Sequence, residues 1–99
     1  MIVLLACAAP RPAPPFAEVP AIRAPTLTEL CASYAQAHLA REGTTTAHGC
    51  HDERIDGERG EVTLTVRYAH WGYSLVLDAR REGERRALAN VRRGSTFHR

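Results

Sequence analysis

The sequence predicts an α+β fold in which one N-terminal helix packs on a three- to four-stranded antiparallel β-meander. Two patterns lead to this prediction. Apolar residues recur at spacings of three and four over residues 27–42, which is the period of a helix. Over residues 61–68 every second residue is apolar, which is the period of a strand with one buried face. A chain of 99 residues has room for one small domain.

The expected helix has both a start signal and a stop signal. Thr26 and Glu29 are spaced as a capping box, in which the threonine hydroxyl and the glutamate carboxylate satisfy free N–H groups of the first turn. Gly43 is placed to end the helix in a left-handed conformation. The side chains expected on the buried stripe are Leu27, Leu30, Cys31, Tyr34, Ala35 and His38.

Turns separate three segments with strand patterns. The alternation over residues 61–68 returns over residues 73–79 after a turn at residues 70–72. Beyond a second turn the pattern is weaker and places Ala87, Ala89 and Val91 on one face. Residues 44–55 lack apolar alternation, so they are expected to form either an edge strand or an ordered loop.

This order of elements is similar to that of known small domains. The helix is followed by the run ERIDGERGEVTLTVRY and by two further strands. That order resembles the cystatin-like and NTF2-like domains found in many bacterial lipoproteins. The resemblance implies a fold and carries over no functional residue.

The N-terminal segment, residues 1–7, is a short apolar run that ends at Cys7. The motif Leu4-Leu5-Ala6-Cys7 resembles the lipobox of bacterial lipoproteins, although Leu5 is larger than the usual residue and no charge precedes the run. The resemblance implies a signal peptide cut before Cys7 and a lipid on the Cys7 thiol. It places the protein in the cell envelope, anchored to a membrane and facing the periplasm or the exterior.

Residues 8–25 follow as a proline-rich segment that contains all six prolines of the chain. Proline fixes φ and removes a hydrogen-bond donor, so this segment is expected to be an extended tether, about 55 Å long. An untethered tail, or a ligand for a proline-binding groove, is an alternative use of the same composition. The folded domain is expected over residues 26–99.

Cys31 and Cys50 are the two cysteines that remain if Cys7 carries a lipid. An exported domain with a thin core is where a disulfide is expected, so the sequence predicts a Cys31–Cys50 bond. The alternative is two separate thiols. A metal site that uses His48, Cys50 and His51 is a further alternative, but their spacing matches no established site, so no metal or other cofactor is predicted.

Arginine supplies all thirteen basic residues, and seven of them lie within residues 79–99. The side chains of Arg80, Arg81, Arg85 and Arg86 flank one turn and are the predicted anion-binding residues. The alternative is a solvated sheet face that protects an edge from aggregation.

No catalytic motif is found, so the sequence predicts a non-catalytic, membrane-tethered envelope lipoprotein that presents a small binding domain. Its partners would be the membrane, through the lipid, and an anionic envelope polymer or a protein. The alternative is a soluble module that binds anions or nucleic acid through the arginine hairpin. The net charge of +2 does not favour nucleic acid.

Overall fold

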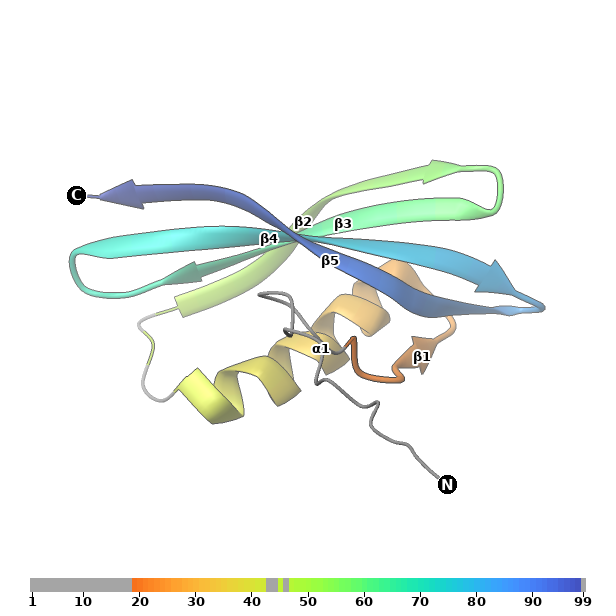
Figure 1. Cartoon of the computed structure of the whole chain (residues 1–99), viewed down its shortest axis with the longest axis horizontal. Coiled ribbons are helices and arrows are strands. Elements are labelled where there is room, and N and C mark those ends of the chain that lie inside the picture. Colours follow the sequence, from red (N-terminus) through yellow and green to blue (C-terminus); the bar gives the residue numbers. More distant parts are fainter. Residues whose placement is uncertain (1–18, 43–44, 46, 99) are drawn as a thin grey trace, which may run out of the picture.

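Residues 19–42, 45 and 47–98 are described by the computed structural model, and they form one antiparallel sheet with one helix on it (Figure 1). Cys7, segment 1–7 and most of segment 8–25 lie outside the described residues. The strands are adjacent in the order β1-β5-β4-β3-β2. The elements are β1 (Arg23–Ala24), α1 (Leu27–Glu42), β2 (Ala47–Asp56), β3 (Arg59–Arg67), β4 (Trp71–Glu82) and β5 (Arg85–His98).

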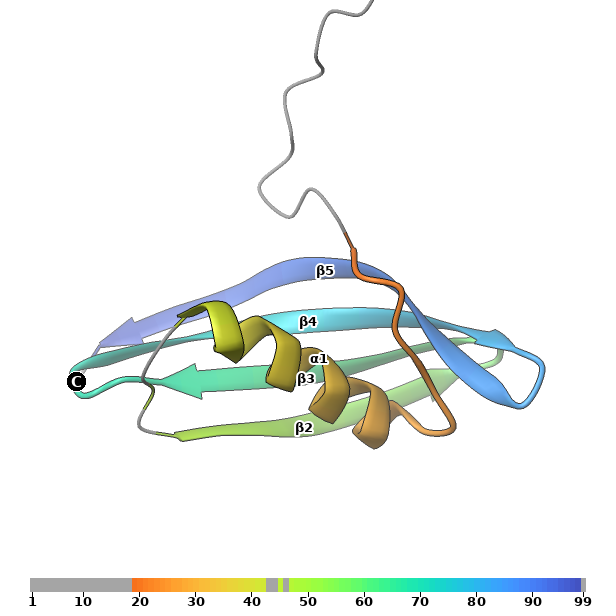
Figure 2. The same cartoon turned by 90° about the horizontal axis from the view of Figure 1, so that it is seen from below.

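The predicted fold class is wrong, because the sheet dominates the structure. It has five strands among the described residues, where three to four were expected, and it twists and curls around a single helix (Figures 1 and 2). The two-residue strand β1 lies inside the segment expected as a tether, and Ala24 is buried there. Residues 47–56 form the edge strand β2. The sequence had left the choice between an edge strand and an ordered loop undecided for residues 44–55.

The prediction of which residues in the last strand face the core is also wrong. A bulge places two residues of β5, Leu88 and Asn90, opposite the consecutive residues Ala79 and Asp78 of β4, with Ala89 left between them. The extra residue shifts the alternation, so that Leu88 and Val91 face the core while Ala89 is exposed. β5 also continues seven residues beyond the expected end, to His98, because it stays paired with β4.

Helix α1 occupies the expected residues. The Glu29 N–H donates to the Thr26 hydroxyl oxygen at 3.1 Å, and that hydroxyl donates to the Glu29 carboxylate at 3.1 Å. These contacts satisfy a free N–H group of the first turn. The buried stripe contains Leu27, Leu30, Cys31, Tyr34 and Ala35, as expected from their spacing, and His38 is half-buried.

The hydrophobic core lies between α1 and one face of the sheet, as Figure 2 shows from the helix side. The sheet contributes Val62, Leu64 and Val66 from β3, Leu75, Leu77 and Ala79 from β4, and Leu88 and Val91 from β5. Gly60 allows α1 to approach β3 closely, since a Cβ atom there would lie 2.9 Å from the Leu27 side chain. The opposite face of the sheet is not covered by α1.

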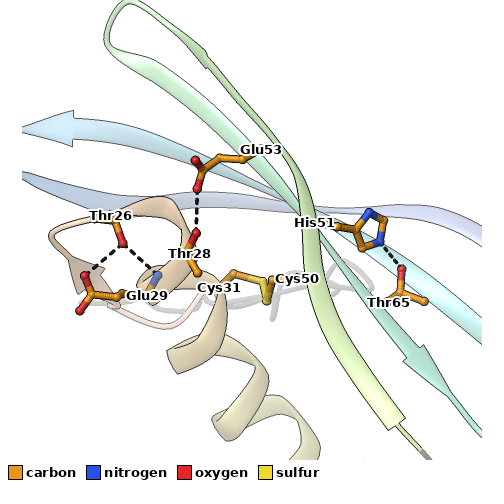
Figure 3. The surroundings of a disulfide bond; sticks show 8 residues. All are labelled: Thr26, Thr28, Glu29, Cys31, Cys50, His51, Glu53 and Thr65. Carbon is orange, nitrogen blue, oxygen red and sulfur yellow. Dashed lines mark hydrogen bonds between the residues drawn. A yellow bond between two sulfur atoms is a disulfide. The ribbon is translucent and has the colours of Figure 1, made fainter.

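The predicted Cys31–Cys50 disulfide is confirmed (Figure 3). Cys31 is fully buried on the helix stripe, and Cys50 lies on β2 opposite Leu64. The bond therefore joins the helix to the edge strand, whose side chains are otherwise almost all exposed. Because few apolar contacts hold β2, the disulfide and the ladder to β3 are its main attachments.

A bulge in β2 follows the disulfide. His51 and Arg54 lie opposite Thr63 and Glu61, so two residues of β2 face the single residue Val62. Asp52 adopts a left-handed conformation there, with a φ of 56°. The Glu53 side chain then turns toward the helix, where its carboxylate accepts a hydrogen bond from the Thr28 hydroxyl at 3.0 Å. Arg54 consequently points away from the helix.

Replacing both cysteines (C31A/C50A) is expected to lower the free energy of unfolding by about 3 kcal/mol, because the bond closes a loop with a sequence separation of 19 residues. The measurement is urea unfolding followed by the fluorescence of Trp71. Reduction of the unaltered protein should produce a similar loss. If neither treatment moves the unfolding midpoint, β2 is held by its ladder alone and the expectation is wrong.

Candidate functional site

The face of the sheet turned away from α1 is the candidate functional surface, and we call it the outer face. In an antiparallel sheet, residues directly opposite one another point to the same side. Asp56, Arg59 and Arg80 therefore form one row across β2, β3 and β4 on this face. The next row contains Arg54, Glu61, Asp78 and Asn90, from β2, β3, β4 and β5.

These two rows line a hollow of about 580 Å³, which we call the charged hollow. It lies toward the end of the sheet where the β2–β3 and β4–β5 hairpins turn (Figure 1). A hollow of this size is within the range that holds small molecules. Its lining residues are Arg54, Asp56, Arg59, Gly60, Glu61, Asp78, Ala79, Arg80, Ala89 and Arg92.

Two carboxylates of the charged hollow share one arginine. Glu61 and Asp78 lie directly opposite each other on β3 and β4. Arg92 donates to both oxygens of Asp78, from Nε at 2.8 Å and from Nη2 at 3.0 Å, and Nη2 lies 3.5 Å from Glu61. The hydrogen bond to Asp78 raises the pKa of the Arg92 guanidinium above its ordinary value, and the charges of Asp78 and Glu61 act in the same direction. The single positive charge of Arg92 thus offsets part of the negative charge of the acidic pair.

The arginines of the charged hollow are not matched in the same way. Arg59 and Arg80 also lie directly opposite each other on β3 and β4. Among the described residues, no carboxylate lies within ion-pairing distance of Arg54, Arg59 or Arg80. By register, Asp56 lies opposite Arg59, and Glu61 lies opposite Arg54. Three guanidinium groups therefore line the charged hollow without a protein counter-ion.

The four arginines predicted to bind anions do not gather at one place. Arg80 lies in the charged hollow, whereas Arg81 and Arg86 pair in the neighbouring row, whose side chains point to the helix side. Arg81 donates to the Gly83 carbonyl at 3.1 Å. Arg86 reaches under Gly60, and its Nη1 is buried without a hydrogen-bond partner. Arg85 lies at the hairpin turn, opposite Glu82.

Sequence reasoning missed Arg54 and Arg59, and it left Arg92, which follows the arginine hairpin, out of the four predicted anion-binding residues. The alternation of residues 61–68 already placed Glu61 on the polar side of its strand, and extending it by two residues would have added Arg59. The register between β3 and β4 brings Arg59 opposite Arg80. The turn between these two strands sets that register, and the sequence pattern does not fix the turn to within one residue.

A second, smaller hollow of about 310 Å³ lies on the outer face beside His51. The two ring nitrogens of His51 contact the Asp52 carboxylate at 2.9 Å and the Thr65 hydroxyl at 2.6 Å. Figure 3 shows His51 on the side of β2 opposite Cys50. The Asp52 side chain is 72% exposed and that of His51 48%, so water competes for both groups. These contacts fix the ring orientation of His51.

The structure gives no support to the metal alternative. The sulfur of Cys50 is used in the disulfide, so it offers no thiolate. Within the described part of the chain, no three His, Cys, Asp or Glu side chains are grouped so as to hold a metal ion.

Trp71, the first residue of β4, is partly exposed. Its side chain is 40% exposed and stacks on Tyr68 with 4.8 Å between ring centroids. Tyr73 stacks beside both rings and contacts His38 of the helix at 2.7 Å. The cluster therefore closes the end of the core at the β3–β4 hairpin and leaves part of Trp71 in solvent.

Comparison with known proteins assigns no family: no family model matches the chain, and no curated protein or solved structure matches it significantly. The resemblances to bacterial lipoproteins and to cystatin-like or NTF2-like domains therefore stay predictions. Among the described residues, α1 does not have the length and apolar content needed to cross a membrane.

Replacing Arg92 by methionine is expected to lower the free energy of unfolding by about 0.5–1 kcal/mol, because Glu61 and Asp78 would then repel each other across the two strands. The matched control is Arg93→Met, since Arg93 is adjacent, exposed and without an ion pair among the described residues. The measurement is urea unfolding at low and high salt. Equal losses in the two variants would show that Arg92 does not act through its carboxylates.

Proposed function

We propose that this protein is a non-catalytic envelope lipoprotein, tethered to a membrane by a lipid on Cys7, that presents its outer face as a binding surface. The observation that carries the proposal is the Cys31–Cys50 disulfide. Structural disulfides form and persist in oxidising compartments outside the cytosol. Export to such a compartment agrees with the lipobox-like residues that end at Cys7.

The arrangement of the domain supports a role in binding. One face of the sheet is covered by the helix and forms the core, whereas the outer face carries a hollow lined by charged side chains. Burying such side chains would be costly, so a polar sheet face exposed in this way suits contact with polar or charged ligands. The proposed tether would join the domain at β1, which pairs with the Arg86–Leu88 segment of β5. Helix α1 covers the other face of the sheet.

A soluble module that binds nucleic acid is the alternative, and the charged hollow argues against it. Asp56, Glu61 and Asp78 lie among the arginines of the charged hollow. A long polyanion laid across this surface would meet carboxylates as often as guanidinium groups, whereas nucleic-acid surfaces are basic over an extended area. A compact anion that reaches only the arginines fits better.

The intact mass of the protein recovered from bacterial membranes tests the tether. We expect a chain that lacks residues 1–6 and carries diacylglyceryl and acyl groups on Cys7, found in the membrane fraction. The Cys7→Ala variant should keep residues 1–6 and move to the soluble fraction. An unmodified, full-length mass in the soluble fraction for both proteins would sink the proposal.

A further inference from the structure

Two pairs of like charges lie side by side on the outer face. Glu61 faces Asp78, and two residues further along the same strands Arg59 faces Arg80. Like charges directly opposite each other on neighbouring strands destabilise a sheet. The structure relieves the first pair by placing the Arg92 guanidinium across both carboxylates. An anion across Arg59 and Arg80 would relieve the second pair in the same way.

No anion of the protein takes that place among the described residues. Glu61 and Asp78 are the carboxylates of the neighbouring row, and both are engaged by Arg92. Asp56 is the remaining acidic residue of the hollow, and it lies outside ion-pairing distance of Arg59, Arg80 and Arg54. Among the described residues, the protein therefore places no ion-pair partner on Arg59 and Arg80, and an external anion can take that place.

We infer that the charged hollow binds a phosphate monoester, held between Arg59 and Arg80 with Arg54 at its side. Guanidinium groups are planar forks that bind phosphate oxygens in pairs. A phosphate monoester carries about −1.5 to −2 charges at pH 7, which balances the two facing arginines. This inference rests on the proposed binding role of the outer face and names the ligand class of that surface.

The size and the acidic residues of the hollow define the rest of the ligand. The hollow of about 580 Å³ has room for a further group beside one phosphate, so a ligand larger than inorganic phosphate fits it. Asp56 lies next to Arg59 and can accept hydrogen bonds from hydroxyl or ammonium groups. The shared chemistry is thus a phosphate on a small polar group, which either a free phosphorylated compound or a lipid headgroup supplies.

The test uses the full chain with Cys7→Ala, so that no lipid is attached, in four forms. One keeps all arginines, one carries R59Q/R80Q, and the control R81Q/R85Q removes the same charge from the β4–β5 hairpin outside the hollow. The fourth form, R54Q, tests whether Arg54 contacts the phosphate held between Arg59 and Arg80. The probes are glycerol 3-phosphate in calorimetric titration, and phosphatidylcholine vesicles with and without phosphatidic acid in sedimentation.

We expect R59Q/R80Q to weaken binding by about tenfold or more, because two charge-assisted contacts with the phosphate are lost together. R81Q/R85Q should weaken phosphate binding by less than about threefold, because these two charges attract the phosphate only from a distance, where salt screens them. Without phosphate, R59Q/R80Q should melt at a higher temperature than the parent, because the repulsion is removed. With phosphate, the parent should gain stability and the variant should not.

Binding of glycerol 3-phosphate would identify a free phosphorylated ligand, and binding seen only with phosphatidic acid vesicles would identify a headgroup. Both results support the inference. It is overturned if neither probe binds, or if R81Q/R85Q weakens binding as much as R59Q/R80Q. The mass of Cys7 is measured separately, so a lipidated protein without phosphate binding contradicts only this inference. If the Cys7→Ala form binds phosphate but the protein with Cys7 intact is recovered from bacteria without a lipid, only the tether is contradicted.

Discussion

The disulfide between Cys31 and Cys50 is the constraint on which the outer face depends. Strand β2 buries almost none of its side chains, so packing does not decide which of its faces turns to the helix. A shift by one residue would exchange the two faces. The bond to buried Cys31 requires Cys50 to face α1, and His51, which follows it, must then face away (Figure 3). The covalent link therefore sets the orientation of the whole edge strand.

The bulge and the tight turns carry that orientation to the charged hollow. The additional residue at Asp52–Glu53 turns Glu53 toward Thr28 and Arg54 outward. Gly57 and Gly83 both adopt positive φ, as the first central residue of a two-residue hairpin turn requires. The two hairpins meet where the Arg81 N–H donates to the Glu58 carbonyl at 2.8 Å. This bond continues the pairing of β3 with β4, which brings Arg59 opposite Arg80.

Local patterns of the sequence predict the parts of the fold that local chemistry decides. The capping box at Thr26 and Glu29, the helix stripe and the alternation of Val62, Leu64 and Val66 each lie within one element, and each appears as expected. The edge strand and the phase of β5 depend on pairing between elements. β2 has no apolar alternation to reveal it, and the bulge at Ala89 comes from the match of β5 to β4, so neither shows in the local pattern.

In the candidate site too, some residues could be predicted from the local sequence and others depend on the pairing of strands. Arg80 was expected to bind anions because it lies in a dense run of arginines, but that run divides between the two faces of the sheet. Arg54 and Arg59 lie far from it in the sequence and reach the same hollow through strand pairing. The density of arginines along the chain pointed to an anion-binding surface. Only the register of the sheet shows which arginines lie in the same hollow.

An open hollow of this kind binds one phosphate weakly, because its exposed charges are screened by salt and no closed wall excludes water. The proposed tether offsets that weakness. A domain held by a short linker samples its surroundings at an effective concentration on the order of millimolar, which is enough to fill a weak site on the same membrane. The disulfide adds to this by holding β2 with the backbone of Arg54 in place before the ligand arrives, so that binding has to order only its side chain. The proposed tether and the disulfide would thus act together on the unpaired arginines. The tether keeps the hollow close to its ligand and the disulfide preorganises it, so that binding does not need a high intrinsic affinity.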